Sequence, residues 1–94
     1  MNVDEDPHKG FYWAEKAAAG GHIFGQSKLG KCYEEGLGTE VDYEKAFDWY
    51  TKAADAGDHE AQVTLGLFYE KGQGVKKNLV KAFNLFHKSQ ENRF

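Results

Sequence analysis

Apolar side chains recur at helical intervals along this chain, and glycines separate one apolar run from the next. Between residues 58 and 71 the apolar positions fall at i, i+4, i+7 and i+8, the stripe of an amphipathic helix: Ala61, Leu65, Phe68 and Tyr69. No segment alternates apolar and polar residues with a period of two over a useful length. The pattern therefore predicts helices and no strands.

Applied along the whole chain, the same spacing predicts five helices, at residues 6–19, 22–35, 42–56, 58–71 and 78–90. Four of them begin at a residue whose side-chain oxygen can accept a hydrogen bond from a free backbone amide: Asp6, Asp42, Asp58 and Asn78. Glycine ends a helix readily because it adopts left-handed backbone conformations, and Gly72 follows the fourth predicted helix.

The apolar pattern repeats with a period of 36 residues. The in-phase positions include Trp13 and Trp49, Leu29 and Leu65, Tyr33 and Tyr69, and the triplet Phe11, Phe47 and Phe83. A period of this length is typical of stacked supersecondary units that bury their apolar faces against one another, and such stacks usually bind other proteins. We predict an all-α solenoid forming one domain over 1–94. Residues 1–21 are the second-half helix of an incomplete repeat, and 22–57 and 58–94 are two complete repeats.

Two glycines stand inside predicted helices, where glycine costs about 1 kcal/mol relative to alanine. They are Gly30 and Gly66, at the same place in both repeats. We expect them to let two helices approach closely and to leave room for a large partner such as Tyr50 or Phe86.

The residues that recur in phase resemble the Sel1-like repeat, a relative of the tetratricopeptide repeat. The similarity rests on Lys52 to Ala54, Gly57, the run from Leu65 to Val75, and the Lys81-Ala82 pair. The resemblance implies antiparallel helix pairs stacked into a right-handed superhelix, which serves as an adaptor or scaffold for other proteins, in some members within larger signalling proteins.

Some secreted bacterial members of that family carry a disulfide in each unit and are associated with binding or hydrolysis of β-lactams. The resemblance therefore offers an alternative, a small-molecule-binding protein or hydrolase. Cys32 is the one cysteine here, so no intrachain disulfide can form and a reducing compartment is the simpler interpretation. No leader and no apolar run long enough to cross a bilayer is found, and we expect a cytoplasmic protein without a membrane partner.

Composition and spacing argue against several kinds of chemistry. A formal net charge of −3 argues against nucleic-acid binding, which needs an excess of positive charge to contact the phosphate backbone. None of the four histidines stands at i, i+4 to another histidine or cysteine: His8, His22, His59 and His87. We expect no enzyme activity, no metal and no cofactor.

The resemblance implies that the first helix of each pair lines the concave face of the stack. On these helices the residues opposite the apolar stripe are Ser27, Lys31 and Glu34, then Val63, Leu67 and Glu70. We predict that these six form the floor of a groove for a protein or peptide partner, with Val63 and Leu67 as apolar anchors and Lys31 and Glu70 setting charge complementarity. In the alternative, Val63 and Leu67 pack inside the fold.

The last predicted helix is apolar over more than one face, through Leu79, Val80, Phe83, Leu85 and Phe86. Stacked repeats need polar terminal caps to stay soluble. These residues either meet a further repeat of a longer array or meet a second copy of the chain.

Overall fold

A computed structural model of the chain describes residues 6–91 and contains five α-helices. They are α1 (Pro7–Ala19), α2 (Ile23–Glu35), α3 (Tyr43–Asp55), α4 (His59–Lys71) and α5 (Leu79–Glu91). Within residues 6–91 no strand occurs. The all-α prediction is confirmed, and each helix begins and ends within one residue of its predicted bounds.

Side-chain caps explain where the helices begin. An oxygen of each predicted capping residue accepts a hydrogen bond from a backbone amide two or three residues later, at 3.0 to 3.2 Å, in Asp6, Asp42, Asp58 and Asn78. The helices α2 and α4 end at Gly36 and Gly72, whose φ angles of 74° and 72° lie in the left-handed region.

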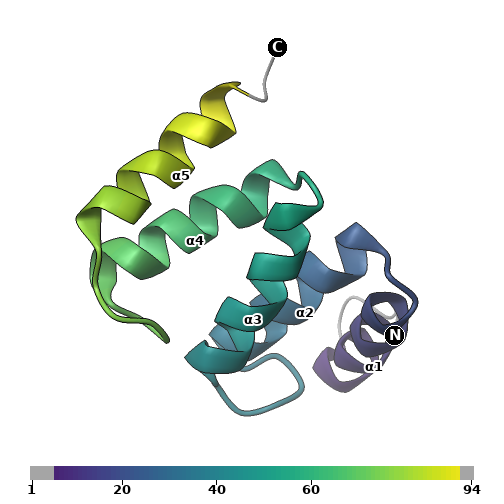
Figure 1. The fold of residues 1–94 in the computed structure, drawn as a ribbon. Helices are drawn as coiled ribbons and strands as arrows, with labels where there is room; N and C mark the ends of the chain where they lie inside the picture. Colours follow the sequence, from purple (N-terminus) through teal and green to yellow (C-terminus); the bar gives the residue numbers. More distant parts are fainter. Residues whose placement is uncertain (1–5, 92–94) are drawn as a thin grey trace.

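Consecutive helices pack side by side, α1 on α2, α2 on α3, α3 on α4 and α4 on α5, and together they form a curved row (Figure 1). The row measures 42 × 28 × 21 Å along its principal axes. Two buried clusters fill it. One consists of Ala14, Ala18, Leu29 and Cys32, between α1 and α2. The other lies between α3 and α4 and includes Tyr50 and Phe68, whose ring centroids are 5.7 Å apart.

The glycines inside α2 and α4 lie against aromatic rings, in agreement with the sequence prediction. A Cβ placed on Gly30 would lie 3.1 Å from the Tyr50 ring, and one placed on Gly66 would lie 2.5 Å from Phe86 Cε1. Both distances are shorter than ordinary carbon contacts of about 3.5 to 4.0 Å. Glycine at these two positions therefore allows each first-half helix to pack closely on the helix that follows it.

Candidate partner-binding groove

A pocket of about 370 Å³ lies between α2 and the beginning of α4. Five residues of α2 and two at the start of α4 line it: Ile23, Phe24, Ser27, Lys28, Lys31, Asp58 and Glu60. The pocket forms because the repeat places the two first-half helices one after the other along the stack.

Charges of opposite sign line this pocket from its two sides. Lys28 and Lys31 belong to α2, whereas Asp58 and Glu60 belong to the start of α4. Phe24 is 73% exposed at the pocket, and the Lys28 ammonium lies 5.4 Å from the centroid of its ring. The pocket can therefore contact an apolar group and pair with both an acidic and a basic group of a ligand.

Three of the six predicted groove residues are exposed, all on α4, and the three on α2 are half-buried. Ser27 and Lys31 line the pocket. Val63 and Leu67, one turn apart on α4, are each 39% exposed, and Glu70, in the next turn, is also exposed. Val63 and Leu67 do not belong to either buried cluster, so both remain available as apolar anchors.

Glu34, the sixth predicted residue, is partly exposed but also contacts a residue of the core. Its carboxylate accepts a hydrogen bond of 2.8 Å from the Tyr50 hydroxyl, and its side chain is half-buried. Burial raises the pKa of Tyr50 well above its usual value of about 10, and the hydrogen bond and charge of Glu34 raise it further. Because Glu34 accepts this hydrogen bond, it is less free to contact a partner than Glu70.

The apolar surface expected on the last helix is smaller than the sequence indicates. Leu79, Val80 and Phe83 are 60%, 70% and 67% exposed. Leu85 packs against the cluster between α3 and α4, and Phe86 lies against Gly66. Three of the five residues therefore form the surface available for self-association.

The row of five helices and its 36-residue repeat correspond to a known family model, the Sel1 repeat, which matches residues 1–22, 23–58 and 59–91. The chain belongs to the Sel1 repeat family. Proteins with this repeat are generally non-catalytic scaffolds that act as protein-interaction modules.

Three solved Sel1-type structures are similar to the chain. A protective antigen of uropathogenic Escherichia coli with an SLR fold is 33% identical, with a TM-score of 0.87, over 89% of this chain and 18% of that one. A Sel1 repeat protein from Oxalobacter formigenes is 32% identical, with a TM-score of 0.88, over 93% and 36%. The Helicobacter pylori cysteine rich protein B is 32% identical, with a TM-score of 0.82, over 87% and 62%. The chain thus spans less than two thirds of each of these proteins. A search of curated proteins gave no match.

The sequence interpretation did not assign several pocket residues of this Sel1 repeat chain to the groove. Ile23 and Lys28 lie on α2 beside the predicted face, and Asp58 and Glu60 enter the pocket from the start of α4. Asp58 was expected only to cap its helix, which it also does. The opposite charges of the two segments could have indicated these residues, but only if α2 and α4 were already known to be neighbours.

Among residues 6–91 no group of three or more His, Cys, Asp or Glu side chains could hold a metal ion. Cys32 is buried, and burial raises the pKa of its thiol, an effect that the charge of Lys28 opposes in part. The thiol therefore remains protonated at neutral pH, the form that is a poor nucleophile.

Proposed function

We propose that this Sel1 repeat chain is a non-catalytic protein-interaction module that binds a protein or peptide partner along the exposed faces of α2 and α4. The observation that carries the proposal is the pair of exposed apolar side chains on α4, Val63 and Leu67, together with a pocket at the start of the same helix whose two walls carry opposite charges. Apolar anchors surrounded by polar side chains are the usual arrangement of a protein-binding surface.

The lining residues indicate the chemistry of the partner. An apolar side chain would contact Val63 and Leu67, which the helix spaces one turn apart. An acidic group would pair with Lys28 or Lys31, and a basic group with Asp58 or Glu60. A segment that combines these three features fits the groove better than one of a single charge. A role within a larger signalling protein is part of the proposal.

The absence of catalysis is also part of the proposal, and two observations support it. Burial keeps the Cys32 thiol protonated, and no histidine lies among the residues that line either pocket in the part of the chain the structure describes. A nucleophile needs a neighbouring base or a lowered pKa. The hydrolase alternative, suggested by the secreted members of the family, thus has less support than the interaction module.

A cytoplasmic location is likewise a proposal, supported by the single buried cysteine. No helix among residues 6–91 is long and apolar enough to cross a membrane. Titration of the unfolded chain with a thiol reagent bears on this proposal: one free thiol, that of Cys32, is expected, and a blocked Cys32 would favour the alternative.

Self-association through Leu79, Val80 and Phe83 is a separate part of the proposal, because their side chains give α5 an exposed apolar surface. Sedimentation velocity over a range of concentrations tests it. A monomer at every concentration would remove this part and leave the groove unaffected.

The groove is tested by affinity capture with the unmodified chain and with Leu67→Glu. Replacing one of the two apolar anchors with a carboxylate should abolish capture of a partner that the unmodified chain retains, while the far-UV circular dichroism stays helical. The matched control is Val41→Glu, which adds a charge to a side chain 51% exposed in the loop between α2 and α3. Equal capture by all three chains would contradict the proposed groove.

A further inference from the structure

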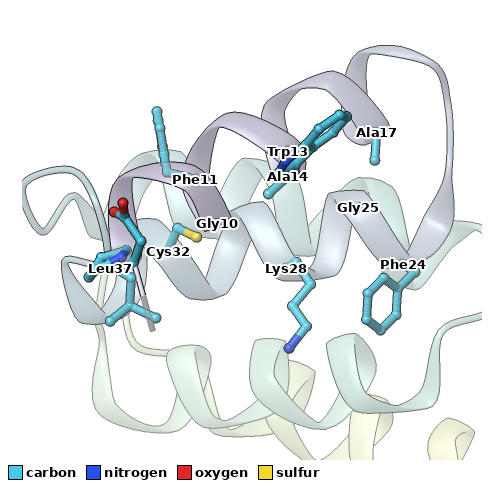
Figure 2. A pocket seen from close by; sticks show the side chains of 12 residues that line it. Gly10, Phe11, Trp13, Ala14, Ala17, Phe24, Gly25, Lys28, Cys32 and Leu37 are labelled. Atoms are coloured by element: carbon cyan, nitrogen blue, oxygen red, sulfur yellow. The ribbon is translucent and has the colours of Figure 1, made fainter. Parts of the chain in front are cut away.

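A second and larger pocket lies at the α1 end of the row. It has a volume of about 470 Å³ and is lined mainly by α1 and α2. Figure 2 shows Trp13, Ala14 and Ala17 on one helix and Lys28 and Cys32 on the other. Its walls are largely apolar. Phe24 and Lys28 also line the pocket of the proposed partner groove, whereas the other lining residues, Trp13, Ala14 and Cys32 among them, do not.

The 36-residue period identifies what covers the equivalent surface inside the chain. Trp49, the counterpart of Trp13, is half-buried against the cluster that includes Leu29 and Cys32 of α2. Trp13 itself is 57% exposed. In the same way the Tyr50 ring of α3 lies against Gly30 of α2, whereas its counterpart Ala14 lines the pocket. On α1 the surface around Trp13, which corresponds to the one that α2 covers on α3, is thus open, although Ala14 is only 6% exposed because it also packs in the cluster between α1 and α2.

The depth of the pocket has a specific cause. Inside the chain the Tyr50 and Phe68 rings meet edge to face at 5.7 Å and fill the space beneath α2. Their counterparts at the pocket are Ala14 and Cys32, which are both much smaller. Suppose that a further helix packs on α1 in the way that α2 packs on α3. An apolar space would then remain beside the residue of that helix that corresponds to Gly30 of α2.

We propose that this pocket docks an amphipathic helix of a partner protein. The helix has the apolar pattern of a first-half Sel1 helix, but carries a leucine or an aromatic residue where α2 and α4 have Gly30 and Gly66. That side chain fills the space above Ala14 and Cys32. Among the described residues, both first-half helices are packed inside the fold and both carry glycine at this position. A second copy of the chain therefore offers no helix of this kind.

Three synthetic peptides with the sequence of residues 58–72 test the proposal, one unmodified, one Gly66→Ala and one Gly66→Leu, each measured by fluorescence anisotropy of the labelled peptide. Alanine raises helix propensity without filling the space, so it controls for the effect of helicity. We expect the leucine peptide to bind the chain roughly tenfold more tightly than the alanine peptide, because its additional methyl and methylene groups leave water.

Variants of the chain locate the binding. Ala14→Tyr and Cys32→Phe each restore a ring that the inner repeat has, so either one should remove the advantage of leucine. Two variants are used because both positions are buried and one substitution can impair folding, which circular dichroism reports. Leu67→Glu changes only the proposed groove and should leave peptide affinity unchanged, so failure of one site is distinguishable from failure of the other.

Equal binding of the alanine and leucine peptides would overturn the proposal. So would a leucine advantage that persists in both folded pocket variants, because the peptide would then bind elsewhere. Self-association of the chain that Ala14→Tyr abolishes would show that a second copy is the occupant, contrary to the proposal.

Discussion

Replacing Gly66 with alanine tests the close packing of α4 on α5. The substitution gains about 1 kcal/mol in helix propensity. Against this, the new Cβ would lie 2.5 Å from Phe86 Cε1 and 2.9 Å from two further atoms of the ring. Overpacking of this kind costs about 1 to 3 kcal/mol. Because the overlap involves three ring atoms, we expect Gly66→Ala to lower the free energy of unfolding by about 1 to 2 kcal/mol.

Two other glycines provide matched controls for the same substitution. Gly10 lies inside α1, and nothing lies within 4 Å of a Cβ placed there, so Gly10→Ala should stabilise the chain by about 1 kcal/mol. Gly30 is intermediate, since its Cβ would lie 3.1 Å from a Tyr50 ring that the hydrogen bond to Glu34 holds in place. For Gly30→Ala the gain and the cost should nearly cancel.

Urea unfolding followed by circular dichroism measures all three variants. With an m-value of about 1 to 2 kcal/mol per molar, Gly66→Ala should lower the midpoint by roughly 1 M, and Gly10→Ala should raise it by somewhat less. A Phe86→Leu change in the Gly66→Ala chain should recover part of the loss, which a double-mutant cycle quantifies. If Gly66→Ala stabilises the chain as much as Gly10→Ala does, the close approach of α4 and α5 is not what keeps glycine there.

Three further outcomes follow from the contacts described. Because the pKa of Tyr50 is raised in the folded chain, its contribution to stability is full below about pH 10 and falls by up to about 1.4 kcal/mol for each pH unit above it. In urea titrations at rising pH, the free energy of unfolding should therefore fall less steeply for Tyr50→Phe than for the unmodified chain. Asn78→Ala removes the acceptor for the Lys81 amide and should cost about 1 kcal/mol in the same assay, whereas an unchanged midpoint would show that this cap contributes nothing. Cys32 should react with a thiol reagent far more slowly in the folded chain than in urea, and equal rates would show that it is not buried.

The helices could be predicted because their signals are local. The spacing of Ala61, Leu65 and Phe68 lies within one helix, and an Asp58 cap needs only the amide two residues on. The recurrence of Gly30 and Gly66 extended this to packing, since both in-phase aromatic partners are visible in the sequence.

The groove and the end pocket could be predicted only in part, because both depend on which helices become neighbours. Glu34 and Glu70 occupy the same place in the repeat and were expected to act alike. Tyr50 donates a hydrogen bond to Glu34, but its in-phase counterpart Phe86 has no hydroxyl with which to contact Glu70. The end pocket arises from differences between repeats, such as Ala14 in place of Tyr50, whereas the sequence interpretation relied on what the repeats share.

In this row the substantial contacts join each helix to the next one along the chain. Such a molecule behaves as a one-dimensional series, whose stability is the sum of a term for each helix and a term for each junction. It can fray from either end one helix at a time, passing through partly folded forms that a globule held by distant contacts would not populate. Short sequence separation between the contacting helices also favours rapid refolding. Hydrogen exchange should therefore be fastest in α1 and α5 and slowest in α3.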